Sequence, residues 1–365
     1  MNARERWLAA LDMQPVDRLP FWPKLNSTYA RLNGAPSGDR ALPDLHAWIG
    51  SDELSWIRPC TREVRADTEQ VSSQENGRQI TSYRTPIGEL HAASKLEPVS
   101  GAAHPVEYPV KTVEDVKVLT AFYQDAKIEL NEDAAAEMVA LARSPGRTTA
   151  VGCTIASTPI MAWVQHLAGP ENCHYLLLEH PAEVKAFFEV MHSRSRRQFE
   201  ILCAHCPADF FMFNENTSTT LISPAQYRAH SYPYIKEMAD LARVAGKRVV
   251  LHMCGHLKAL LPDLATLHVS GFEAYTTPPV GNATLFDARS ICTDTCFIGG
   301  TNAALWLRPT HEIIVDLEKE LAALPHHRGL VITSAGVMPP AVKPETVKEV
   351  CAWVHGYKTG LGIRD

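Results

Sequence analysis

The second half of the chain alternates between short apolar runs and helical patterns, and this alternation constrains the fold more than any other feature. Runs rich in β-branched or aromatic residues lie at 148–155, 209–216, 248–255, 271–277, 295–301 and 329–336. Between them, helical patterns lie at 183–206, 224–245, 257–267, 285–291 and 311–323. Strands that alternate with helices are typical of βαβ units, so the pattern predicts a parallel sheet.

With two earlier strand candidates, one of them the apolar run 19–25, the runs add up to eight strands. Eight βα units predict a closed (β/α)8 TIM barrel. An open, doubly wound sheet is the alternative, but no G-x-G-x-x-G motif follows any of the runs, which disfavours a dinucleotide-binding fold. We therefore predict one barrel domain over residues 1–365, with an N-terminal helical and hairpin extension within 1–147 and regular βα units over 148–365.

The extension is less regular than the rest of the chain. We expect a helix in the first 18 or so residues, with Trp7, Leu8 and Leu11 on one face. The alternating segment 81–95 contains Thr85-Pro86-Ile87-Gly88 and predicts a β-hairpin. Further helices are expected over 113–122, with Thr112 as N-cap, and over 131–143.

Composition excludes several classes of protein. The 365 residues carry 35 Lys+Arg against 41 Asp+Glu and have no basic run, which disfavours nucleic-acid binding. With 45% hydrophobic residues the chain has an ordinary globular balance. No stretch approaches about 18 consecutive apolar residues, so no membrane span is expected. The first residues lack the apolar segment of a secretory signal, and nine cysteines without such a signal favour a reducing cytoplasm.

In a parallel barrel the functional side chains gather at the carboxyl ends of the strands. The sharpest feature at such an end is His252-x-Cys254. Residues i and i+2 of a strand project to the same side, so an imidazole and a thiolate lie together there, as zinc prefers. The alternative is a core histidine and a core cysteine that are two residues apart by chance.

Glu215 ends the strongly apolar run 209–216, on the strand before the His-x-Cys strand. A carboxylate at that point is costly unless it is paired or ligated. We therefore expect Glu215, His252 and Cys254 to act together as catalytic residues and zinc ligands, with a fourth position open. The alternative for Glu215 is a salt bridge with an arginine of a loop.

Four further residues are candidates for binding a substrate. Trp22 and Tyr29 could line an aromatic site, Tyr275 lies at a strand end, and Asn302 follows Gly299-Gly300-Thr301 and could hydrogen-bond a ligand. The alternatives are aromatic packing in the core and an amide that caps a loop.

The motifs together resemble the uroporphyrinogen decarboxylase superfamily, whose members are (β/α)8 barrels. The resemblance covers most of the chain. It is carried by His104-Pro105 to Leu119, Thr85 to Gly88, Leu221-Ile222-Ser223-Pro224, Val250 to Gly255, Gly281 to Leu285, and Pro339-Pro340 to Val347. True decarboxylases of this superfamily have an Arg-Gln-Ala-Gly-Arg-Tyr type segment that binds propionates. Here residues 23–29 lack the paired arginines, so porphyrinogen decarboxylation is not expected.

The cobalamin-dependent methyltransferases of the superfamily are the more similar branch, since they carry a His-x-Cys-Gly zinc motif that His252, Cys254 and Gly255 match. Many of them also place a cysteine ligand before the Pro-Pro pair. In this chain that segment, residues 334–340, has no cysteine, and Gly336 stands where the sulfur is expected. One thiolate fewer would leave a bound metal harder and better suited to oxygen than to sulfur substrates.

The resemblance thus implies a zinc-dependent methyltransferase component. It would move a methyl group between a small methylated compound, most simply a methoxy compound, and a corrinoid (cobalamin) held by a partner protein. The alternatives are a metal-free decarboxylase, a component that methylates thiols, and a barrel that binds a small molecule or corrinoid without catalysis. A homodimer is compatible with the sequence.

Overall fold

The computed structural model describes residues 1–34, 41–97, 103–142, 144 and 146–358. Within these residues, no helix combines the length and the apolar character that crossing a membrane requires. Residue 143, the last of the helix expected over 131–143, lies outside the described part.

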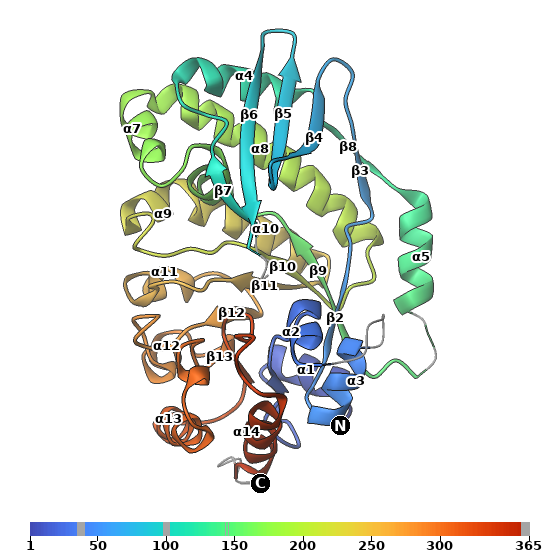
Figure 1. Cartoon of the computed structure of the whole chain (residues 1–365), viewed down its shortest axis with the longest axis vertical. Coiled ribbons are helices and arrows are strands. Elements are labelled where there is room, and N and C mark those ends of the chain that lie inside the picture. Colours follow the sequence, from blue (N-terminus) through green and yellow to red (C-terminus); the bar gives the residue numbers. More distant parts are fainter. Residues whose placement is uncertain (35–40, 98–102, 143, 145, 359–365) are drawn as a thin grey trace.

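Eight parallel strands form one nearly closed barrel, so the predicted TIM barrel is confirmed (Figure 1). The order of the sheet is β1-β14-β13-β12-β11-β10-β9-β2, which means that each barrel strand from β9 on pairs with the barrel strand before it in the chain, while β1 pairs with β14 and leaves a seam with β2. The strands are β1 (Phe21–Trp22), β2 (Leu54–Ile57), β9 (Ala150–Ile155), β10 (Phe210–Phe213), β11 (Arg248–His252), β12 (Gly271–Tyr275), β13 (Cys296–Gly299) and β14 (Leu330–Thr333).

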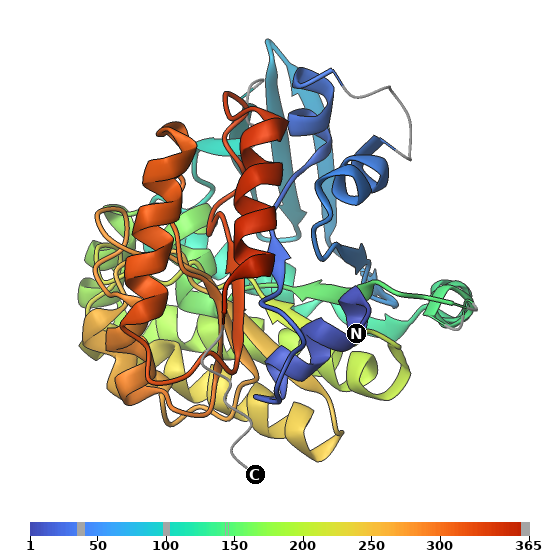
Figure 2. The same cartoon turned by 90° about the horizontal axis from the view of Figure 1, so that it is seen from below.

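Helices follow the strands and cover the outside of the barrel. Figure 2 shows the last two, α13 and α14, lying side by side. The helices are α1 (Ala3–Leu11), α2 (Ser27–Leu32), α3 (Ala41–Ile49), α4 (Val113–Gln124), α5 (Glu132–Ala142), α6 (Pro159–Ala162), α7 (Asn172–Glu179), α8 (Pro181–His205), α9 (Pro224–His230), α10 (Tyr232–Val244), α11 (Leu261–Leu264), α12 (Leu285–Ile291), α13 (Thr310–Ala322) and α14 (Pro344–Gly356). The π-helix η1 (Trp163–Leu167) and the 3-10 helices η2 (Lys258–Leu260) and η3 (Leu305–Leu307) complete the set.

Two helical expectations need correction. The first helix ends at Leu11, well before residue 18. The pattern over 224–245 is not one helix but two, α9 and α10, which meet at Ser231. Pro233 lies in the first turn of α10, where its missing N–H and its ring prevent a continuous helix.

In the described residues, the seam between β1 and β2 is closed by one backbone hydrogen bond and by side chains rather than by a strand ladder. Asp52, just before β2, donates its N–H to Phe21 O (2.7 Å) and accepts the Phe21 N–H on its carboxylate (3.0 Å). Its carboxylate also pairs with Arg6 of α1, and Trp22 packs against Trp56 of β2 with ring centroids 6.4 Å apart. These contacts join the first and second strands without a ladder.

Helix α1 closes the amino-terminal end of the barrel. Trp7 is fully buried and packs against Trp22 and Phe210 inside the barrel. The helix is also tied to the starts of two strands, because the side chain of Arg4 pairs with Asp209 before β10 and its N–H donates to Thr148 O before β9 (2.6 Å). With this end covered, the carboxyl ends of the strands remain as the open end.

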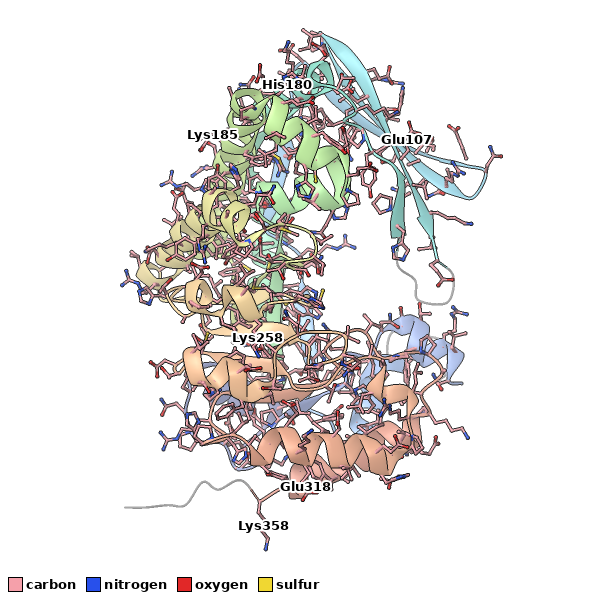
Figure 3. All side chains as sticks on the ribbon, turned by 90° about the vertical axis from the view of Figure 1, so that its left-hand side faces the viewer. Glu107, His180, Lys185, Lys258, Glu318 and Lys358 are labelled. Atoms are coloured by element: carbon pink, nitrogen blue, oxygen red, sulfur yellow. The ribbon has the colours of Figure 1, made fainter. Side chains whose placement is uncertain are left out.

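An antiparallel sheet of four strands stands beside the barrel. Its strands are β4 (Glu69–Glu75), β5 (Arg78–Thr85), β6 (Gly88–Leu96) and β7 (Ala103–Glu107), while β3 (Thr61–Val64) and β8 (Lys127–Leu130) form a separate pair. The β5–β6 hairpin has Thr85 opposite Gly88, which confirms the predicted hairpin. Figure 3 shows the sheet, on which Glu107 is labelled, projecting away from the helices that carry Lys185 and Lys258.

Candidate active site

The site is built on the end of β11, where the strand leaves the barrel. His252 is the last strand residue and Cys254 follows two positions later. Gly255 lets the chain turn toward η2, because a Cβ there would lie 2.2 Å from the Cβ of Ser218. Of the nine cysteines seven are buried, whereas Cys254 is half-buried and thus reachable from the open end.

A carboxylate and an ammonium group hold the imidazole of His252 in place. Glu273 lies opposite His252 in the β11–β12 register, and its carboxylate is hydrogen-bonded to His252 Nδ1. The other oxygen of Glu273 lies 2.5 Å from Lys24 Nζ, and Lys24 also donates to Ala335 O (3.0 Å). The array therefore joins the loop after β1, strands β12 and β11, and the loop after β14.

These neighbours shift the pKa values of the array. Burial alone would lower the pKa of His252, but the charge of Glu273 and the hydrogen bond with Cys254 raise it to about 9. Burial would raise the pKa of Cys254, yet its hydrogen bond with His252 and the charge of that ring lower it. Burial would raise the pKa of Glu273, whereas Lys24 and His252 lower it to about 2. The array thus favours alternating charges from ammonium to thiolate.

A network of amides reaches the other side of Cys254. Cys254 Sγ lies 3.5 Å from Asn216 Oδ1, and Asn216 donates its N–H to His252 O (2.8 Å). Asn216 Nδ2 donates to Oε1 of Gln165 (2.8 Å), a residue of the π-helix η1. Asn216 has a positive φ of 50°, a conformation that asparagine adopts more readily than most residues.

Glu215 is not placed with His252 and Cys254. Its Oε1 accepts the N–H of Thr158 (2.5 Å), and its Oε2 accepts the hydroxyls of Thr158 (2.8 Å) and Ser231 (3.2 Å). The carboxyl group is fully buried, and this burial raises its pKa to about 7. The expected set of three ligands is therefore corrected: Glu215 turns toward Thr158 at the start of α6 and toward the α9–α10 junction, where hydroxyls and a backbone N–H satisfy it.

Across the described chain no three His, Cys, Asp or Glu side chains gather in a metal-binding group. At residues 334–336, where the resemblance suggested a further ligand, Ser334 Oγ lies within hydrogen-bond distance of Gly336 O (2.6 Å) and Pro23 O (2.9 Å), to either of which its hydroxyl can donate. A Cβ on Gly336 would meet only Ala303 Cβ, at 3.7 Å. The loop thus has room for a side chain that the sequence does not supply.

The four residues expected to bind substrate instead make packing contacts and hydrogen bonds within the protein. Tyr29 is fully buried with its hydroxyl on Val342 O (2.7 Å), and Tyr275 packs on Phe297. Asn302 caps a loop, because it donates to Pro278 O and accepts from Leu305 N. Trp22 belongs to the barrel interior, and its ring centroid is 5.6 Å from Lys24 Nζ. Apolar burial and internal hydrogen bonds account for these residues.

Sequence reasoning missed Glu273, Lys24, Asn216 and Gln165. One signal was present: Glu273 stands inside the apolar run 271–277, where a carboxylate needs a partner as much as Glu215 does. The amide network carried no such signal, because an asparagine at a strand end and a glutamine in a helix are ordinary there.

Comparisons with known proteins give a family match for the sequence and similar folds among solved structures. Residues 92–357 match the sequence profile of the family described as Uroporphyrinogen decarboxylase (URO-D). A methyltransferase from Methanosarcina mazei has a similar fold, with a TM-score of 0.60 and 14% identity over 97% of this chain and 98% of that chain. A protein described as a vitamin-B12 independent methionine synthase from Listeria monocytogenes is less similar, with a TM-score of 0.42 and 11% identity over 61% and 68% of the two chains. No protein with a curated description matches the sequence.

Proposed function

The chain belongs to the uroporphyrinogen decarboxylase family, and from this we propose that it is an enzyme of the methyltransferase type within that family. It would move a methyl group between a small methoxy compound and a corrinoid carried by a partner protein. The fold shared with a methyltransferase along nearly the full length of both chains supports this choice.

The observation that carries the proposal is the His252–Cys254 pair at the open end of the barrel. Because Glu273 occupies Nδ1 of His252, the other ring nitrogen, Nε2, is the one that could bind a metal, which would replace its proton and its hydrogen bond with Cys254. The same neighbours favour the thiolate of Cys254, which is the form of cysteine that binds metals. Donors of these two kinds, with a carboxylate behind the histidine, are typical of zinc sites.

When bound, zinc would supply Lewis acidity toward the heteroatom that carries the methyl group. The residues of the chain have separate tasks. Glu273 orients the imidazole of His252, and Lys24 keeps Glu273 ionised in a buried position. The half-buried Cys254 leaves the site open toward the carboxyl ends of the strands, where a substrate and the corrinoid of a partner must both approach.

Porphyrinogen decarboxylation is less compatible with these residues. Lys24 is the only basic residue of the segment 23–29, and its charge is neutralised by Glu273 at 2.5 Å. It is therefore not available to bind the propionates of a porphyrinogen, and no second cation stands beside it in that segment.

The test measures methyl transfer and zinc content together. Purified protein is incubated with cob(I)alamin and a panel of methoxylated benzoates, and in the other direction with methylcobalamin and a panel of thiols. Absorbance reports the state of the cobalt. We expect transfer from methoxy compounds by the parent, and loss of both zinc and transfer in Cys254→Ser, since one of few metal bonds is removed.

Cys203→Ser is the matched control, because Cys203 is the other half-buried cysteine and lies on α8. It should keep the zinc content and the activity of the parent. Gly336→Cys, which the loop accommodates, should gain zinc affinity and activity on thiols. Unchanged zinc in Cys254→Ser, or activity on thiols alone, would contradict the proposal.

A further inference from the structure

Zinc centres that catalyse reactions usually have three protein ligands, and the site described above has two. A third donor atom is nevertheless present beside the thiol of Cys254. It is Oδ1 of Asn216, which lies 3.5 Å from Cys254 Sγ. Asn216 is half-buried and lies in the loop just after β10, the strand next to β11.

The hydrogen bonds determine which atom of the amide faces the thiol. Gln165 Nε2 donates to Met161 O (3.1 Å) and Glu215 O (3.3 Å), so Gln165 Oε1 remains as the acceptor. Only Nδ2 of Asn216 can donate to that oxygen, which it does at 2.8 Å. The carbonyl oxygen of Asn216 is therefore turned toward Cys254.

The backbone holds the same arrangement. The N–H of Asn216 donates to His252 O (2.8 Å), so its backbone is tied to the last residue of β11, two positions before Cys254. Gln165 belongs to a π-helix, a rare element that often occurs at functional sites. A buried network that fixes one donor atom at an open site is typical of residues that support a metal ligand.

The spacing fits two ligands of one ion. Zinc binds sulfur at about 2.3 Å and oxygen at about 2.1 Å, so two such ligands at a tetrahedral angle lie about 3.6 Å apart. The observed 3.5 Å between Cys254 Sγ and Asn216 Oδ1 agrees with this value. Without a metal, the same contact is a weak hydrogen bond from the thiol of Cys254 to Oδ1 of Asn216. The experiment must therefore distinguish two ligands of one metal ion from this hydrogen bond.

We propose that Asn216 Oδ1 is the third protein ligand at the site, with Gln165 as its positioning residue, an inference that rests on the proposed function. The amide would stand in for the cysteine that Gly336 does not provide. With one thiolate, one imidazole and one neutral oxygen, the metal keeps more positive charge than with two thiolates. Such a centre favours oxygen-bearing substrates such as methyl ethers.

The experiment measures the dissociation constant of zinc by competition with a chromophoric chelator, and the absorption spectrum of the Co²⁺-substituted protein. Asn216→Ala should weaken zinc about tenfold or more, and Gln165→Leu about 10- to 100-fold, as losses around metal sites do. Asn216→Asp should tighten zinc, because a carboxylate replaces a neutral amide. The cobalt d–d bands should shift in both Asn216 variants.

Asn214→Ala and Asn214→Asp are the matched controls, since Asn214 is exposed at the end of the same strand. Neither should change zinc affinity or the cobalt spectrum. Zinc affinity unchanged by Asn216→Ala in a parent that binds zinc would overturn the inference while leaving the proposed function intact. A parent that binds no zinc would overturn both the inference and the metal part of the proposed function. Equal effects at 214 and 216 would also overturn the inference.

Discussion

The buried ion array of Lys24, Glu273 and His252 leads to a quantitative prediction about stability. The side chains are 11%, 2% and 19% exposed, respectively. Glu273→Gln keeps the size of the side chain but removes the charge that Lys24 and His252 share. Breaking a buried pair from one side leaves an uncompensated charge and costs about 3–5 kcal/mol. We therefore expect the free energy of unfolding to fall by that amount.

The pKa of His252 gives an independent estimate of the same size. The pKa is about 9, against about 6.5 for an ordinary histidine, and each pKa unit corresponds to about 1.4 kcal/mol. Retaining the proton on His252 therefore stabilises the folded protein by about 3–4 kcal/mol, an amount that depends largely on Glu273.

The sign of the pH dependence follows from the two shifts. The contribution of His252 is complete below its unfolded pKa of about 6.5 and is lost as the pH rises through about 9. The contribution of Glu273 is present above its unfolded pKa of about 4.3 and is lost as the pH falls toward about 2. The difference in stability between parent and Glu273→Gln should thus be largest between about pH 4.5 and 6.5.

The assay is urea denaturation of protein freed of metal with a chelator, at pH 5.5 and pH 9.5. Glu129→Gln is the control, because Glu129 forms an exposed ion pair with Arg62 that contributes about 0–1 kcal/mol. The double variant Lys24→Met/Glu273→Gln should lose less than the sum of the single losses, since neither charge is then left alone. A Glu273→Gln cost no larger than that of Glu129→Gln, or additive losses, would refute the reasoning.

Three further predictions concern other parts of the molecule. Because burial raises the pKa of Glu215 to about 7, its contribution to stability is present below its unfolded pKa of about 4.3 and is lost as the pH rises toward 7. Glu215→Gln should therefore flatten the pH profile of the urea midpoint over that range, and parallel profiles would contradict this. Gly255→Ala should lower the melting temperature and weaken zinc binding, since its Cβ would lie 2.8 Å from the Cα of Ser218; an unchanged melting curve would argue against this close approach. Asp52→Asn should cost about 3–5 kcal/mol in urea denaturation followed by circular dichroism, because it breaks a buried pair with Arg6; a cost below 1 kcal/mol would mean that the β1–β2 seam does not depend on it.

The barrel was predictable because its signal is local. The centre of a run such as 209–216, Phe210 to Phe213, is apolar on both faces, as a strand covered by helices must be, and the run lies between helical patterns. The predicted ends of the strands and helices were less accurate. Strand β1 is only Phe21–Trp22 within the predicted run 19–25. The helix predicted over 224–245 is interrupted at Ser231, whose hydroxyl donates to Glu215.

The candidate site was predictable only in part, because only some of its residues are brought together by a local sequence pattern. His252 and Cys254 stand on one strand, so the two-residue period of that strand is enough to place them together. Glu215 was assigned to the site because burying a carboxylate costs free energy unless it has partners. Which residues act as those partners depends on the direction in which the side chain of Glu215 points. Thr158 and Ser231 meet it there, and neither lies near it in the sequence.

The sequence by itself thus determined the fold class and the pairing of His252 with Cys254 at one strand end, because both follow from periodicities within a single strand or helix. Only the tertiary structure decided what surrounds that pair. Glu273 comes from the neighbouring strand in a particular register, Lys24 from the loop after β1, Asn216 from the loop after β10, and Gln165 from a π-helix. Their contacts with His252 and Cys254 depend on strand register and on side-chain packing across the barrel, and the spacing of residues along the sequence does not predict either.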